Sequence, residues 1–211
     1  TLRTLIGSEH VPIEVKTKKV YEVSKNIMSE FFEQNASPKI LTASDEVVEI
    51  MEECFSDADV SFYNISQLTS KDYYTYTHSV NVGLYCMTYG IKINLPKEET
   101  RQLGLGGMLH DVGKSKMRGD LINKEGLLTE DEFDEIKDHA SMGEDILTEM
   151  NCYGRCVLDM AAQHHEKYKG GGYPKGLEGE AISIYGRICK VMDVYDALTT
   201  RRSYKKALNP F

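Results

Sequence analysis

The run HDVGK, residues 110–114, ends a helix that the sequence predicts to begin after Pro96. Adjacent helical positions diverge by about 100°, so His110 and Asp111 hold one ion together only if the backbone bends, which Gly113 favours. A carboxylate has two oxygens and is able to bridge two cations, as in two-metal hydrolases, whereas an imidazole serves one. The run therefore predicts a helix end that carries metal ligands. A surface histidine beside a capping aspartate is the alternative.

Helical periodicity extends from this run in both directions, and no segment alternates convincingly with period two. The pattern predicts an all-α bundle with strand content close to nil. Besides the central helix and one that starts at Thr129, the predicted helices are residues 13–34, 44–55, 72–89, 154–167 and 181–200.

Local signals set the ends of these helices. The pair Ser37-Pro38 separates the first two, and Gly90 is expected to stop the third. Thr129 and Glu132 have the spacing of a capping box, and the helix that they start is expected to turn Phe133 inward. These signals leave the histidine-bearing segments at or near helix ends.

Five of the six histidines fall into clusters with carboxylates, and only His10 is left over. The pair His164-His165 offers separate ligands to two neighbouring ions, although a paired histidine taken alone is more often a solvated one. Asp193 and Asp196 lie one turn apart on a helix that is otherwise apolar on the side of Ile188, Val191 and Ala197, where an unpaired carboxylate is costly. Imidazoles and carboxylates are ligands that iron, manganese and zinc share. The set predicts two adjacent metal sites, with Asp196 supporting a ligand rather than being one.

Composition limits the class of protein further. The net charge of −8 argues against general binding of DNA or RNA, for which a basic surface is expected. The run RRSYKK, residues 201–206, is the exception, and it is suited to an anionic ligand. No apolar run approaches the roughly 18 residues needed to cross a bilayer, so no membrane insertion is expected. Five scattered cysteines predict reduced thiols and a cytoplasmic location.

Taken in order, HDVGK, HHE, GGGYP and DVYDALTTRRSYKK resemble the HD-GYP family of cyclic dinucleotide phosphodiesterases over residues 72–209. The HDxGK motif alone indicates the wider HD phosphohydrolase superfamily. The GYP triplet after HHE, residues 172–174, separates this family from its relatives. The resemblance implies an HD-type helical bundle that holds two divalent ions, iron or manganese, and that hydrolyses cyclic di-GMP to pGpG or further to GMP.

The resemblance also implies roles for individual residues. The expected metal ligands are His78, His110, Asp111, His139, His164, His165 and Asp193. The expected catalytic residues are Asp111 and Lys114, with Lys114 beside the scissile phosphate. The expected nucleotide contacts are Tyr173, Arg202 and Lys205, together with Lys114. Family members with a third metal carry glutamate four residues before the first ligand histidine. Tyr74 stands there in this chain, so two metals are expected.

The chain is expected to divide near residue 70. Residues 1–70 are predicted to form an N-terminal helical region, as an extension or the remnant of a regulatory domain, and residues 71–211 the phosphodiesterase domain. The GYP loop is expected to offer a docking site for a diguanylate cyclase domain, and the helices within residues 13–55 to allow a homodimer. Two other interpretations stay open. One is a phosphodiesterase for 3′,3′-cyclic GMP-AMP, and the other is a cyclic di-GMP receptor without turnover.

Overall fold

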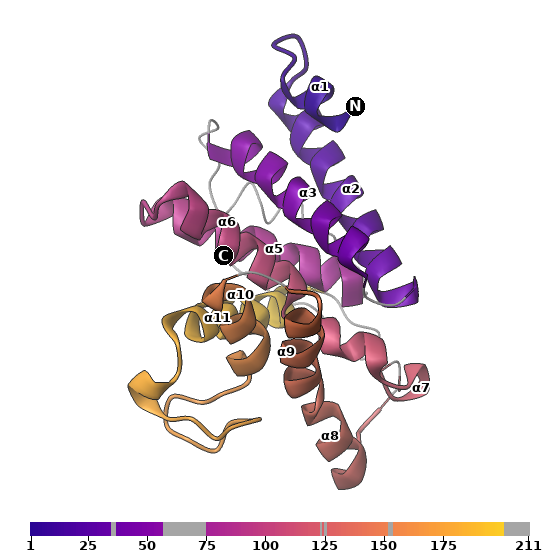
Figure 1. The fold of residues 1–211 in the computed structure, drawn as a ribbon, viewed down its shortest axis with the longest axis vertical. Coiled ribbons are helices and arrows are strands. Elements are labelled where there is room, and N and C mark those ends of the chain that lie inside the picture. Colours follow the sequence, from indigo (N-terminus) through magenta and orange to yellow (C-terminus); the bar gives the residue numbers. More distant parts are fainter. Residues whose placement is uncertain (35–36, 57–74, 123, 125, 152–153, 201–211) are drawn as a thin grey trace.

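The computed structural model describes residues 1–34, 37–56, 75–122, 124, 126–151 and 154–200. Over these residues the chain forms helices and no strand, which confirms the all-α prediction (Figure 1). The α-helices are α1 (Leu2–Ile6), α2 (Ile13–Gln34), α3 (Pro38–Ser56), α5 (Thr75–Lys92), α6 (Lys97–Leu109), α7 (Gly119–Ile122), α8 (Glu130–Lys137), α9 (His139–Glu149), α10 (Arg155–Gln163) and α11 (Ile184–Thr199). The 3₁₀ helices are η1 (Val112–Lys116) and η2 (Gly179–Ala181).

Helices α5 and α6 pack against each other near the centre of the molecule, where glycines let their backbones meet (Figure 1). A Cβ atom at Gly83 would lie 2.9 Å from the carbonyl oxygen of Gly104, and one at Gly107 would lie 2.8 Å from the Cα atom of Gly83. These distances are too short for real Cβ contacts, so only glycine fits there. The close approach brings the start of α5 beside the end of α6, and the ring centroids of His78 and His110 are 5.2 Å apart.

Several helix boundaries differ from the sequence prediction: α10 ends at Gln163, α11 begins at Ile184, and the differences at α5 and α3 have a clear physical reason. Helix α5 runs past Gly90 to Lys92, because that glycine serves packing: a Cβ atom there would lie 3.1 Å from the hydroxyl of Thr100 on α6. Pro38 begins α3 instead of lying in a gap before it. Proline suits the first helical turn since it lacks an N–H that would have no partner there, and the backbone N–H of Ile40 donates to Ser37 Oγ at 3.4 Å.

The predicted capping box at the start of α8 is confirmed. The backbone N–H of Glu132 donates to Thr129 Oγ1, and the Glu132 carboxylate accepts from the backbone N–H of Thr129 at 2.8 Å. The inward turn of Phe133 was wrong, because this side chain is 45% exposed. Helix α8 buries none of its residues, and the Phe133 ring instead lies under the ammonium of Lys137 at 4.7 Å.

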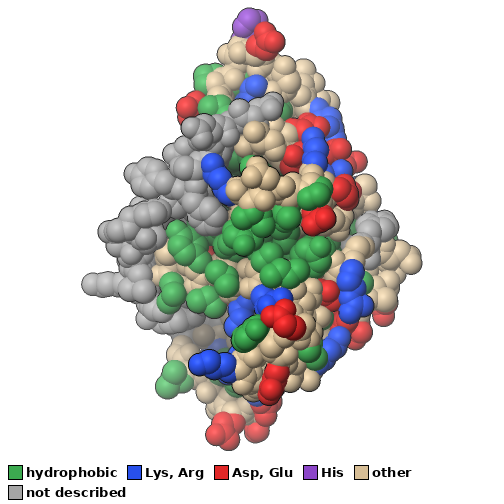
Figure 2. All heavy atoms as spheres, turned by 90° about the vertical axis from the view of Figure 1, so that its left-hand side faces the viewer, with side chains coloured by type: hydrophobic (Ala, Val, Ile, Leu, Met, Phe, Trp, Pro, Cys, Tyr) green, Lys and Arg blue, Asp and Glu red, His purple; other side chains and the backbone are tan. Residues whose placement is uncertain are grey.

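The N-terminal helices α2 and α3 pack on α5 and α6, and one hydrophobic core runs from Val20 to Met192. Figure 2 shows hydrophobic side chains gathered at mid-height on one face of the molecule. Among the described residues, histidine side chains are visible on that face only at the tip of the molecule. His78, His110, His139 and His164 are each no more than 2% exposed. The histidine cluster is therefore an interior feature.

Among the described residues, no helix combines the length and apolar character that a membrane span needs.

Candidate metal centre

Asp111 lies at the centre of the histidine cluster. It follows α6 directly, it is 1% exposed, and its backbone angles of −101° and 10° mark the bend between α6 and η1. Its Oδ1 atom lies 3.3 Å from His139 Nε2 and 3.7 Å from His164 Nε2. Its Oδ2 atom lies 3.4 Å from His110 Nε2 and 3.9 Å from His78 Nε2. Each carboxylate oxygen thus faces a separate pair of imidazoles.

Gly113 has a different use from the predicted bend. A Cβ atom at this position would lie 1.9 Å from the carbonyl oxygen of His139 and 2.8 Å from the backbone nitrogen of Gly143. The backbone of α9 therefore lies against Gly113, which brings His139 up to Asp111. The glycine of HDVGK is needed for this close approach between two helices.

The Nδ1 atoms of the buried histidines are all occupied by hydrogen bonds. Those of His110, His139 and His164 lie 2.7 Å from Gly107 O, 2.6 Å from Ile136 O and 2.9 Å from Met160 O, respectively. A carbonyl oxygen only accepts, so each Nδ1 carries a proton. In the neutral form of the ring this leaves the lone pair on Nε2, which points toward Asp111. Such bonds on the far nitrogen are usual for histidines that bind metals.

The cluster fits divalent cations and is poorly satisfied without them. His139 Nε2 and His164 Nε2 face each other at 3.2 Å although both carry lone pairs. Among the described residues, His110 Nε2 and Asp111 Oδ1 have no hydrogen-bond partner. Two groups have ligand atoms close enough to share an ion, and Asp111 belongs to both. The groups are Asp111, His139, His164 and His165, and His78, His110 and Asp111.

Neighbouring groups keep the buried carboxyl group of Asp111 ionised. Burial alone would raise its pKa, but the positive charge of the Lys114 ammonium holds the pKa well below the usual range. Lys114 Nζ donates to Asp111 Oδ2 at 2.5 Å. The His164 pKa is lowered to about 4, first by burial and also by the nearby His110. At neutral pH the site therefore presents the Asp111 carboxylate and a neutral His164, the protonation states that a metal requires.

Asp193 and Asp196 approach His78 from α11. Asp193 Oδ1 lies 3.1 Å from His78 Nε2, and its side chain is 16% exposed. Burial raises the Asp193 pKa, but the hydrogen bond and charge of His78 outweigh that effect and lower it. Asp196 Oδ2 accepts from His78 Nδ1 at 2.7 Å and is fully buried. Asp196 thus orients His78, whereas Asp193 reaches the side of the ring that faces Asp111.

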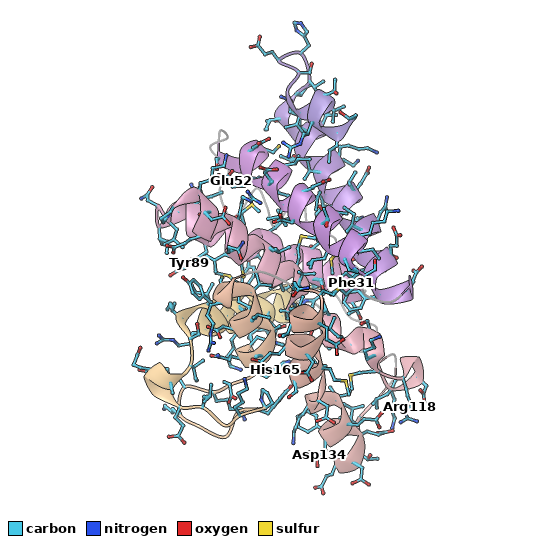
Figure 3. The ribbon with its side chains drawn as sticks, in the orientation of Figure 1. Phe31, Glu52, Tyr89, Arg118, Asp134 and His165 are labelled. Carbon is cyan, nitrogen blue, oxygen red and sulfur yellow. The ribbon has the colours of Figure 1, made fainter. Side chains whose placement is uncertain are left out.

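The loop after α10 adds His165 and Tyr173 to this region. Figure 3 labels His165 in the part of the molecule that holds α9 and α10, below Phe31 and Glu52 of the N-terminal helices. The Tyr173 ring stacks on the His165 ring at 4.6 Å with an angle of 24°. Burial lowers the pKa of His165 and raises the pKa of Tyr173, so both side chains are neutral at pH 7.

Glu166 holds this loop in place. It is 1% exposed, Oε1 accepts from the backbone N–H of Lys175 at 2.8 Å, and Oε2 accepts from that of Leu177 at 3.0 Å. Gly172 lies against it, since a Cβ atom there would be 2.5 Å from Glu166 Cα. The HHE motif thus supplies two imidazoles to the centre and one carboxylate to the GYP loop.

All seven predicted metal ligands, with Lys114, Tyr173 and Asp196, lie in this region of the structure. Arg202, Lys205 and Tyr74 lie outside the described residues. Sequence reasoning missed Asn81, whose Nδ2 donates to Asp196 Oδ1 at 2.9 Å. No motif marks this asparagine, because its partner lies 115 positions away.

The sequence matches the HD domain family over residues 52–210, and the chain therefore belongs to that family. The fold is similar to that of a solved HDG"Y"P protein from Bdellovibrio bacteriovorus, with a TM-score of 0.76 and 18% identity, over 97% of this chain and 67% of that one. That likeness concerns the fold alone. Family, fold and curated relatives together confirm the resemblance to HD-GYP proteins.

Three curated relatives are similar to this chain in sequence. A cyclic di-GMP phosphodiesterase of Pseudomonas aeruginosa is 38% identical over 167 residues, which are 79% of this chain and 40% of that protein. The cyclic di-GMP phosphodiesterase response regulator RpfG of Xanthomonas campestris is 41% identical over 55% of this chain and 31% of its own length. A 3′3′-cGAMP-specific phosphodiesterase of Vibrio cholerae is 29% identical over 99% of this chain and 45% of its own length. The chain spans less than half the length of these relatives.

Proposed function

We propose that this chain is a metal-dependent phosphodiesterase that hydrolyses cyclic di-GMP to pGpG. The observation that carries the proposal is the placement of Asp111, whose two oxygens face two separate pairs of histidines in the interior. The names of the relatives from Pseudomonas and Xanthomonas support the choice of substrate.

Divalent metal binding is consistent with the HD domain and with the two ligand groups. We propose two ions, iron or manganese, with Asp111 between them. One would be held by His139, His164 and His165, and the other by His78, His110 and Asp193. Such ions supply Lewis acidity that brings the pKa of water toward neutrality and offsets charge on a phosphoryl group.

The protein's own residues would position the substrate. Lys114 lies at the edge of the cluster with a side chain that is 19% exposed, and its ammonium would donate to a phosphoryl oxygen as negative charge develops. The half-buried Tyr173 ring would stack on a guanine base while Glu166 keeps the loop in position. Arg202 and Lys205 are proposed to contact the phosphates.

A second substrate is supported by one comparison. The relative that matches 99% of this chain is named for hydrolysis of 3′3′-cGAMP. This dinucleotide carries the same two phosphodiesters as cyclic di-GMP and differs in one base, so the metal centre would act on both. The contacts to the bases would then decide the preference.

The proposal is tested by an anaerobic assay of the manganese-loaded chain with each dinucleotide in turn. Chromatography resolves pGpG from GMP. The proposal expects pGpG from cyclic di-GMP, with faster turnover than of 3′,3′-cyclic GMP-AMP. Tight binding of intact cyclic di-GMP without product would instead favour a receptor, and the reverse order of rates would favour the second substrate.

We further propose a regulatory setting for this activity. Residues 1–70 would form the N-terminal regulatory region and residues 71–211 the catalytic domain. The GYP loop would dock a diguanylate cyclase domain, and α2 and α3 would pair in a homodimer. Among the described residues, Cys86, Cys156 and Cys189 form no disulfide bond, which supports a reducing cytoplasmic location.

A further inference from the structure

A chain of hydrogen bonds connects helix α2 with the metal centre. Tyr21 Oη on α2 lies 2.7 Å from Asn81 Oδ1 on α5, and Asn81 Nδ2 donates to Asp196 Oδ1 on α11 at 2.9 Å. Asp196 Oδ2 lies 2.7 Å from His78 Nδ1. The connection therefore crosses three helices and ends on a residue that faces Asp111.

The direction of each bond in this chain is fixed by chemistry. An ionised carboxylate only accepts, so Asn81 must turn its amide nitrogen toward Asp196 and its oxygen toward Tyr21. Tyr21 is then the donor to Asn81. His78 donates its Nδ1 proton to Asp196, which leaves Nε2 for the side of the ring that faces Asp111 and Asp193.

The whole chain is shielded from water. Tyr21 is 5% exposed, His78 is 2% exposed, and Asn81 and Asp196 are not exposed at all. A buried polar group that loses its partner is not readily compensated by solvent, and bonds in such a network strengthen one another. A change at Tyr21 would therefore disturb Asn81, then Asp196, and through Asp196 the orientation of His78.

We propose that Tyr21 and Asn81 are positioning residues of the metal centre, through which the placement of α2 sets the metal affinity at His78. This inference rests on the proposed function for the metal ions themselves, and it gives the N-terminal helices a direct means of regulation. Partners that lie behind metal ligands typically change metal affinity about 10- to 100-fold when they are removed. Asn81 touches Asp196 directly, and Tyr21 acts one bond further away.

The test is a calorimetric titration of the full 211-residue chain with Mn²⁺. Tyr21→Phe removes one hydroxyl and keeps the ring, and we expect it to weaken Mn²⁺ binding about three- to tenfold. The matched control is Ser24→Ala on the same helix. Ser24 is also buried, but its hydroxyl donates to the carbonyl of Val20 within α2 at 2.8 Å. This bond is not part of the chain of hydrogen bonds that ends at His78.

A double-mutant cycle with Asn81→Leu separates positioning from general destabilisation. We expect Asn81→Leu to weaken Mn²⁺ binding about tenfold or more, and Tyr21→Phe to add no further loss in that background. Urea unfolding of the metal-free variants shows that each is folded. Equal Mn²⁺ affinity of the unmodified chain, Tyr21→Phe and Ser24→Ala would overturn this inference alone, as would fully additive losses. Absence of Mn²⁺ and Fe²⁺ binding by the unmodified chain would overturn the proposed function with it.

Discussion

His139 and His164 turn their Nε2 atoms toward each other at 3.2 Å, while the Nδ1 atom of each ring is bonded to a backbone carbonyl oxygen that lies three or four residues earlier in the chain. Two lone pairs at this distance repel unless a cation lies beside them. The same lone pairs point toward Oδ1 of Asp111, at 3.3 and 3.7 Å. This relationship between two rings, set by backbone bonds, is the strongest structural argument for a metal at this position.

Removal of Asp111 is expected to abolish both metal loading and turnover. Asp111→Ala takes away both oxygens that face the two histidine pairs, so the loss of metal affinity should exceed the roughly hundredfold effect of losing a partner behind a ligand. Metal content after dialysis and turnover of cyclic di-GMP measure it. The control is Asp134→Asn on α8, whose side chain is 70% exposed and pairs with Lys137. Near-native activity of Asp111→Ala would refute the mechanism.

Lys114 is expected to act on the substrate and not to hold the metal. Its ammonium lies 2.5 Å from Asp111 Oδ2, where its positive charge would compete with a cation for that oxygen. Lys114→Met should therefore leave Mn²⁺ affinity equal or higher and lower kcat about 100- to 1000-fold, as for the loss of one donor to a developing negative charge. Lys116→Met, an exposed neighbour on η1, is the control. A fall in Mn²⁺ affinity with unchanged kcat would contradict this role.

The metal-free protein is expected to lose stability as the pH falls from about 6.5 to about 4. Burial lowers the pKa of His164 to about 4, below the ordinary value of 6.5, so the unfolded chain takes up its proton first. The contribution of neutral His164 to the free energy of unfolding is complete above about pH 6.5. At pH 5 the free energy of unfolding should be lower by about 2 kcal/mol. Asp111 and Asp193, whose pKa values are also lowered, add a further loss only below about pH 4.

Urea unfolding at pH 7.5 and pH 5 measures this difference. His164→Asn should flatten the dependence, whereas substitution of His10, near the N-terminus, should not. Equal free energies of unfolding at the two pH values would show that His164 is protonated in the folded protein.

Much of the fold and site could be predicted because the signals are local. The helical periodicity over residues 13–34 predicts α2 with both of its ends. The capping box at Thr129 depends on two residues that are three positions apart. The metal ligands were found through motifs whose order is distinctive. Residues outside those motifs were missed. Tyr21 and Asn81 lie 60 positions apart, and only the packing of α2 on α5 brings them together.

Other errors arose where tertiary packing overrides a local preference. Gly90 has the character of a helix stop, yet contact with α6 requires a glycine inside α5. Helix α11 is apolar on more than one side, so its sequence does not reveal the buried face. The structure buries Cys189, Met192 and Asp196, and leaves Val191 62% exposed.

Tyr173 is expected to bind the substrate through its ring. Tyr173→Ala removes the surface that stacks on His165 and should raise KM for cyclic di-GMP roughly five- to hundredfold, the range of base stacking on an aromatic side chain. Tyr173→Phe should keep KM and kcat, because burial raises the pKa of the phenol and leaves it neutral. Tyr168→Ala is the control on the same loop, since that ring is 57% exposed. An unchanged KM for Tyr173→Ala would limit this side chain to loop packing.

The central claim is a pair of ions on either side of Asp111, and anomalous diffraction from crystals of the manganese-loaded protein tests it most directly. We predict two anomalous peaks, one among His139, His164 and His165 and the other beside His78, His110 and Asp193, with one oxygen of Asp111 toward each. A single peak, or peaks away from Asp111, would contradict the account.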